Sequence, residues 1–267
     1  MIYSGMAFLS IMAALVPISA HAGAWTLPRG DGLAITQATY FSSDEFFNLD
    51  GTTIDQPTFK KIELQPYLEY GLRDWLTIGG STYLQRVSQS DNDNYGIADT
   101  ELFARVRVWE PQNAVLSFQP LVKLPSRFGE SGLPRGGSRS TDLELNVLYG
   151  TAGTRWGFPY YADMRVGYRT RSRDLNSQWR TDIALGINLT DAWQIIPAFR
   201  TVITTEYDEA MPFREDGEQD YDLAKAELTV AYHFDEERWL QATAYDHIAG
   251  AQTGAGRGFS IGFARRF

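Results

Sequence analysis

The last ten residues, "GFSIGFARRF" (258–267), alternate between two kinds of side chain. Phe259, Ile261, Phe263 and Phe267 are apolar, and the residues between these positions are mostly small or polar. A period of two is typical of a β-strand with one apolar face. Because the ends of soluble domains usually fray, an aromatic strand that reaches the last residue must be explained by the rest of the chain.

The same period of two recurs along the chain. Each alternating run is about ten residues long, which is the length of a β-strand that crosses a bilayer at a tilt. An even number of strands is typical of bacterial outer-membrane barrels. The pattern therefore predicts an all-β fold, a transmembrane antiparallel β-barrel of about twelve strands, near 32–41, 63–72, 76–85, 101–108, 114–124, 142–149, 158–168, 179–189, 193–203, 223–234, 238–248 and 258–267.

The connections between these runs alternate between two lengths. Short ones are expected near 72–75, 109–113, 150–157, 189–193 and 234–239. Long polar or Gly-rich ones are expected near 42–57, 87–96, 125–140, 170–177, 205–220 and 249–257. Such a meander has all its short turns at one end, as outer-membrane barrels do at the periplasmic side. The first and last strands should then pair, because a bilayer leaves no sheet edge open.

The first 22 residues have the pattern of a signal peptide that is cleaved during export. They contain an apolar run and end in Ala20-His21-Ala22, a pattern that signal peptidase cleaves. We therefore predict a signal peptide at 1–22, a single barrel at 23–267, and a location in the outer membrane of a Gram-negative bacterium. The run is too short for a helix that spans a membrane, and it has no Lys or Arg before it, which departs from the usual signal-peptide pattern.

Composition excludes several classes of function. The chain has 267 residues and a formal net charge of −9, so it lacks the basic surface with which proteins bind nucleic acid. It has no cysteine, which rules out disulfides and thiolate metal sites. We predict no metal site, no cofactor and no nucleic-acid partner.

Charged residues fall on the side of each strand opposite the apolar face. So many charges would be costly inside a soluble barrel, whereas a water-filled lumen accommodates them. Tyr161 and other aromatic residues share that side. The predicted lumen or solute path consists of Arg105, Arg107, Arg165, Arg169, Arg180, Asp182, Arg200, Glu227, His233 and Tyr161.

Arg165, Arg169, Arg171 and Arg173 form a basic ladder that has two interpretations. It can be a structural network of salt bridges with acidic residues on the neighbouring strands, or a stripe that attracts anions and guides a solute. The sequence leaves both open.

Three of the short turns place a Trp at a strand end, namely Trp75, Trp193 and Trp239. Because Trp prefers the membrane interface, these residues predict an aromatic girdle there.

Catalysis does not fit the pattern. The outer-membrane phospholipase, a barrel of similar size, carries its Ser and His two residues apart on the outer face. Only His233 and His247 lie beyond the predicted cleavage site, and neither has a Ser two residues away. We therefore do not expect an enzyme.

Several stretches resemble the family of outer-membrane channels named for the MetA pathway of phenol degradation. They are "GAWTLPRGDGLAITQATYFSS" (23–43), "LRDWLTIGGSTYL" (72–84), "LTDAWQIIPAFR" (189–200) and the final "GFSIGFARRF". The resemblance implies a small barrel that passes small, often hydrophobic or aromatic solutes. It also implies that Phe267 is the terminal residue that the barrel-assembly machinery recognises.

The expected function is an outer-membrane channel or transporter for a small solute through a narrow charged lumen. The alternative is a plugged structural or adhesive barrel that acts through its acidic outer loops. The expected partners are outer-membrane lipid, lipopolysaccharide, the barrel-assembly machinery and a small-molecule solute. Divalent cations that bridge lipopolysaccharide would bind the acidic loop 205–220, and its phosphates would bind the basic residues of loops 125–140 and 170–177.

Overall fold

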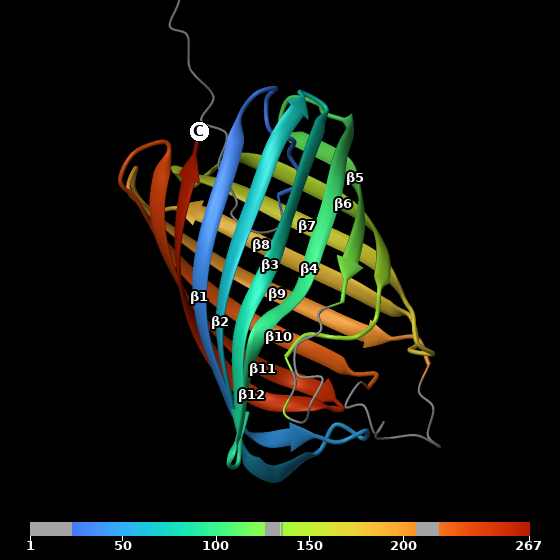
Figure 1. The fold of residues 1–267 in the computed structure, drawn as a ribbon. Helices are drawn as coiled ribbons and strands as arrows, with labels where there is room; N and C mark the ends of the chain where they lie inside the picture. Colours follow the sequence, from blue (N-terminus) through green and yellow to red (C-terminus); the bar gives the residue numbers. More distant parts are fainter. Residues whose placement is uncertain (1–22, 126–133, 135, 207–218) are drawn as a thin grey trace, which may run out of the picture.

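The protein is a closed barrel of twelve antiparallel β-strands (Figure 1). The computed structural model describes residues 23–125, 134, 136–206 and 219–267, so the predicted signal peptide lies outside the described residues. The strands are β1 Gly32–Phe47, β2 Thr53–Arg73, β3 Leu76–Gln89, β4 Asn92–Trp109, β5 Ala114–Leu124, β6 Asp142–Arg155, β7 Phe158–Arg171, β8 Gln178–Asn188, β9 Trp193–Thr204, β10 Asp222–His233, β11 Arg238–Ala251 and β12 Thr253–Arg266. The predicted fold class, strand number and order are confirmed.

Pairing of β1 with β12 closes the barrel. Leu33 lies opposite Arg266 at one end of this pair and Phe47 lies opposite Thr253 at the other. The pairing continues to the last residue, because the backbone N–H of Gly32 donates to the carbonyl of Phe267 at 2.7 Å and that of Phe267 donates to Gly32 at 3.0 Å. The final strand therefore has both of its edges hydrogen-bonded, which is why an aromatic residue can end the chain without fraying.

The ring of Phe267 lies directly over the Cα of Gly32, where a Cβ would overlap it. Phe259, Ile261 and Phe263 point outward and are 45–48% exposed, as the alternation predicts. Arg265 also points outward and is exposed, but it lies one residue from the end of β12. A charge on the outer face is costly at mid-membrane and tolerated near the interface, so Arg265 marks the edge of the apolar belt.

The two faces of the wall differ in the way the alternation predicts. In β2, Leu64 and Leu68 are 43% and 51% exposed on the outside, whereas Glu63 and Glu69 are 9% and 5% exposed on the inside. The same pattern repeats in β6, where Leu143, Leu145 and Val147 face outward and the residues between them face inward. Large apolar side chains in contact with the surroundings on every side are typical of a wall that faces lipid.

No helix among the described residues is long and apolar enough to cross a membrane.

The short turns lie together with the C-terminus at the upper end of the barrel in Figure 1. The β6–β7 turn, for example, is only Trp156 and Gly157, and both have positive φ angles, 52° and 85°. In the β10–β11 turn, Asp235 accepts hydrogen bonds from the Nε and the backbone N–H of Arg238, both at 2.8 Å. The Arg238 side chain is the main cause of a lowered pKa of Asp235.

Two of the expected long loops are instead strand. Residues 87–96 form a hairpin whose turn is only residues 90–91, and 249–257 form another in which Gln252 alone is the connection. Gly258, which directly follows the second of these stretches, pairs with Phe41 in β1. It is glycine because the ring of Tyr245 lies where its Cβ would be, so a missing side chain here makes room for an aromatic ring and does not mark a turn.

The tip of the β1–β2 hairpin bends away from the strand direction at the lower end in Figure 1. The bend coincides with a bulge between Ser43 and Glu45, which shifts the register with both neighbouring strands. The strands are also longer than the expected ten residues, from 11 in β5 to 21 in β2, because they continue past the apolar belt.

The Trp girdle is predicted correctly at two positions and wrongly at the third. Trp75 and Trp193 are 51% and 48% exposed at the short-turn end. Trp239 is only 2% exposed and packs inside the barrel against Leu33 and Ile35. Trp239 points inward because side chains alternate along β11 and the next residue, Leu240, takes the outward position.

Candidate functional site

The lumen contains a cavity of about 640 Å³. Side chains from all twelve strands line it. Eight of the ten residues predicted for the solute path belong to this lining: Arg105, Arg165, Arg169, Arg180, Asp182, Arg200, Glu227 and Tyr161.

The other two predicted residues, Arg107 and His233, are inside the barrel near the short turns but not in the cavity wall. Arg107 pairs with Glu110 of the β4–β5 turn. His233 stacks on Trp239 with 5.6 Å between ring centroids.

One side of the cavity carries a row of charges that the strand register creates. Arg165 in β7 lies opposite Asp182 in β8, Asp182 lies opposite Arg200 in β9, and Arg200 lies opposite Lys225 in β10. Directly opposed side chains on one face of a sheet are close enough to interact. The row therefore follows from the register of four consecutive strands.

Ion pairs connect this row. Asp182 binds Arg165 and, at 3.1 Å, the Nη1 of Arg200. The Nε of Arg200 lies 3.0 Å from Glu227, which also pairs with the Nζ of Lys225 at 2.5 Å. Each carboxylate thus pairs with two bases, an arrangement that orients the basic groups and links the four neighbouring strands β7 to β10.

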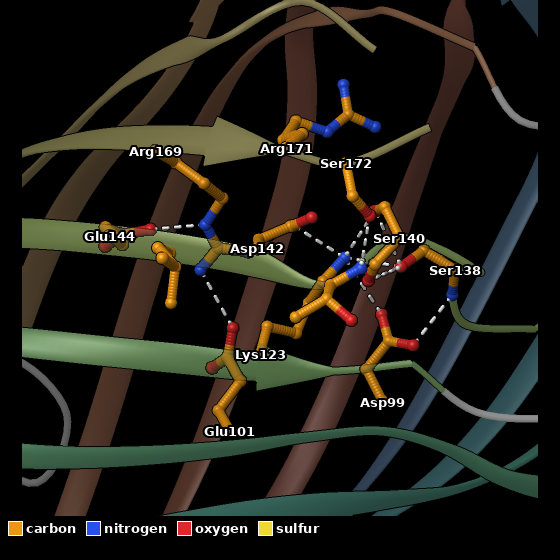
Figure 2. Close-up of polar contacts among 12 residues, drawn as sticks. Asp99, Glu101, Lys123, Ser138, Ser140, Asp142, Glu144, Arg169, Arg171 and Ser172 are labelled. Atoms are coloured by element: carbon orange, nitrogen blue, oxygen red, sulfur yellow. Dashed lines mark hydrogen bonds and ion pairs between the residues drawn. The ribbon is translucent and has the colours of Figure 1, made fainter. Parts of the chain in front are cut away.

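A second network lies deeper in the wall and includes the connection between β5 and β6 (Figure 2). The Nζ of Lys123 in β5 is 2.7 Å from Asp142 in β6 and 3.4 Å from Asp99 in β4. Asp99 in turn accepts a hydrogen bond of 2.8 Å from the backbone N–H of Ser138. Lys123 therefore ties this connection, which contributes Gly136 and Gly137 to the cavity lining, to the inner wall.

Arg169 of the predicted ladder joins the same network. Figure 2 shows its guanidinium between Glu144 and Glu101, and it is 2.9 Å from Glu101 and 3.5 Å from Asp142. Arg171 extends the ladder along β7 toward the long-loop end and pairs with Asp220 at 2.9 Å. Three of these acidic partners, Asp142, Glu144 and Asp182, lie on the neighbouring strands β6 and β8, as the salt-bridge interpretation of the ladder expects.

An aromatic cluster lies on another side of the cavity, called the aromatic side below. Phe41 in β1 stacks on Tyr245 in β11, with centroids 6.2 Å apart and planes 3° apart. His247 packs against Phe41 at 4.8 Å and hydrogen-bonds the carbonyl of Gly254 at 2.9 Å. The Nζ of Lys225 lies 4.9 Å from the ring centre of Tyr245, so the aromatic side adjoins the charged row.

The segment before β1 lies inside the short-turn end of the barrel. The carbonyl of Trp25 accepts a hydrogen bond from Arg105 at 2.9 Å, and that of Ala24 accepts one from Ser117 at 2.6 Å. The backbone N–H of Leu27 donates to Thr77 at 2.7 Å. Arg105 is itself held by Glu69 at 2.7 Å, so the segment is anchored inside this end of the lumen.

Some lining residues were not part of the predicted path. Phe41, Tyr221 and His247 line the cavity. His247 lies on the same inward face of β11 as Tyr245, so the alternation along the strand alone could have identified it as a lumen residue. Nothing in the local pattern of 23–31 indicates that this segment turns into the lumen. Among the described residues, no group of three or more His, Asp or Glu is arranged to hold a metal ion.

No protein-family model matches the chain, and no curated protein matches it in sequence. Solved structures do match in fold. An outer-membrane channel from Pseudomonas putida F1 superposes with a TM-score of 0.73 at 14% identity, over 94% of this chain and 100% of that one. The translocator domain of the autotransporter NalP from Neisseria meningitidis gives 0.52 at 11% identity, over 90% of each chain. The chain therefore has the fold of outer-membrane β-barrels.

Proposed function

We propose that the protein is an outer-membrane channel or transporter for a small organic solute. The observation that carries this proposal is the cavity of about 640 Å³ inside a closed barrel whose outer wall is apolar. A chamber of that volume matches the size of small-molecule sites. The charged lining needs water or a polar solute, which a filled soluble core would not provide.

The fold of the P. putida channel supports a channel role, and the resemblance to channels of the phenol-degradation family favours a hydrophobic or aromatic solute. The same proposal includes export with cleavage before Gly23, assembly through the barrel-assembly machinery, and contact with lipopolysaccharide.

A second candidate, the plugged structural barrel, is favoured by the segment 23–31 in the lumen. The acidic loop invoked for that function lies mostly outside the described residues, at 207–218.

The two candidates differ in conductance. Purified protein, refolded and added to a planar lipid bilayer, should produce discrete current steps if it is a channel. A bilayer that stays silent with the full chain, and also after removal of residues 24–28, would favour the plugged barrel and contradict the proposal.

A further inference from the structure

The charges that face the cavity are mainly basic, although the chain as a whole is acidic. The described residues that line the cavity include seven Lys or Arg and four Asp or Glu. The whole chain carries a formal charge of −9. The cavity lining therefore has the opposite sign to the average of the protein.

Within most of the ion pairs, the base reaches the cavity and the carboxylate lies behind it. The side chains of Arg200 and Asp182 are 24% and 7% exposed, and those of Lys225 and Glu227 are 23% and 10% exposed. Arg180 is 23% exposed whereas its partner Glu144 is fully buried. The pair of Arg169 with Glu101 is the reverse, at 6% and 21%. On balance a solute meets basic groups.

Two buried donors in the wall also have no partner. The Nε of Arg165 and the hydroxyl of Tyr161 make no hydrogen bond with any described residue. Both residues line the cavity and lie on the same face of β7. A buried polar group without a partner is costly, so these atoms are positioned to bind a polar group of a solute.

The basic row adjoins the aromatic side formed by Phe41, Phe59, Tyr245 and His247. Lys225 links the two, since its Nζ pairs with Glu227 and lies over the ring of Tyr245. A molecule with an anionic group at one end and an apolar body at the other would satisfy both sides at once.

We propose that the solute is a small amphipathic organic anion, such as a carboxylate or sulfonate with an apolar ring or chain. Its anionic group binds beside Arg165, Arg180 and Arg200, and its body packs on the aromatic side. This assignment rests on the proposed channel function and specifies its substrate class.

Permanently charged probes test this in a planar bilayer. Reversal potentials are measured across gradients of potassium benzenesulfonate and of benzyltrimethylammonium chloride, which have similar size and opposite charge, and of potassium methanesulfonate. We expect benzenesulfonate to permeate several-fold better than benzyltrimethylammonium and better than methanesulfonate. A channel that conducts but prefers the cation, or does not distinguish the charges, overturns the inference and leaves the channel function intact.

Equal permeation of benzenesulfonate and methanesulfonate would contradict the part of the proposal that requires an apolar ring or chain on the solute. A bilayer without current counts against the channel itself, so the two failures are distinguishable.

Arg180→Gln tests which residues give the selectivity. Arg180 lines the cavity, and its one ion pair with a described residue, Glu144, is long, at 3.7 Å. Arg73→Gln is the matched control, since it removes the same charge from an exposed position at the end of β2. We expect the preference for benzenesulfonate to fall in Arg180→Gln and to stay unchanged in Arg73→Gln. Equal loss in both variants, or no loss in either, would overturn the assignment to this row.

Discussion

Lys123 shows how a single side chain fixes the geometry of the lumen. It is nearly buried and lies between Asp142 and Asp99, neither of which has much access to water. Removing the base would leave Asp99 without its cation and Asp142 with only the more distant Arg169, at 3.5 Å. Loss of one partner from a buried ion pair typically costs about 3–5 kcal/mol.

We therefore expect Lys123→Met to lower the free energy of unfolding by about this amount. The measurement is urea unfolding of the refolded protein in lipid vesicles, followed by tryptophan fluorescence. Lys60→Met is the matched control, because Lys60 is exposed in β2. If both variants unfold at the same urea concentration as the wild type, the Lys123 network does not stabilise the barrel.

Sequence alternation predicts which side chains face the lumen but not which of them meet. Arg105, Arg165 and Arg200 face inward as expected, because side-chain direction in a strand depends only on local backbone geometry. The contact between Asp99 and Ser138 joins residues 39 positions apart through an irregular connection. No periodicity encodes that contact, and the same is true of the degree to which Arg180 is more exposed than Glu144.

At the scale of the element, β12 depends on its last residue. Phe267 is hydrogen-bonded to Gly32 through its backbone and covers Gly32 with its ring. If the assembly machinery also recognises this ring, Phe267→Ser should reduce the amount of assembled barrel in cells, measured as the folded band in gels of unheated samples.

Phe263→Ser is the control, since Phe263 also faces outward and its exposure is 45% against 58% for Phe267. Purified Phe267→Ser should still refold into vesicles. Similar assembly of both variants in cells would falsify recognition of the terminal residue.

The segment before β1 lies inside the lumen at the short-turn end. Its contacts with Arg105, Ser117 and Thr77 would all be lost on deletion of residues 24–28. We expect the single-channel conductance in a planar bilayer to rise, because a segment that lies inside this end of the lumen is removed. Replacing the same five residues with Gly and Ser keeps the length and removes the Trp25 ring, so it should give an intermediate conductance. An unchanged conductance in both variants would show that the segment does not limit the current.

Element boundaries were predicted less well than element number. The runs at 87–96 and 249–257 look like loops because they are rich in polar residues and glycine, yet they are paired strand beyond the apolar belt. Outside the membrane, the outer face of a strand is wet and need not be apolar, so the alternation that identifies a strand disappears there. Gly258, next to the second run, has a separate cause, the neighbouring ring of Tyr245, which only the register reveals.

For the molecule as a whole, the apolar residues of the outer wall determine the depth at which the barrel lies in the bilayer. Outward apolar residues extend along β2 from Ile62 to Leu72, just before the turn that contains Trp75. With the usual strand rise and tilt, this run spans roughly the 25 Å apolar height of such barrels. Leu68 then lies near the middle of the apolar layer and Leu72 near its edge.

The depth assignment predicts unequal effects of one substitution at these two positions. Leu68→Arg should cost about 2–4 kcal/mol and Leu72→Arg about 0–1 kcal/mol, because an outward charge is most unfavourable at the bilayer midplane. Both leucines are exposed on the outside, at 51% and 37%, so neither change disturbs the lumen. The free energy of unfolding is measured in phosphatidylcholine vesicles. Equal costs at the two positions would contradict the assigned depth, and the natural charge at Arg265 would then no longer mark the interface.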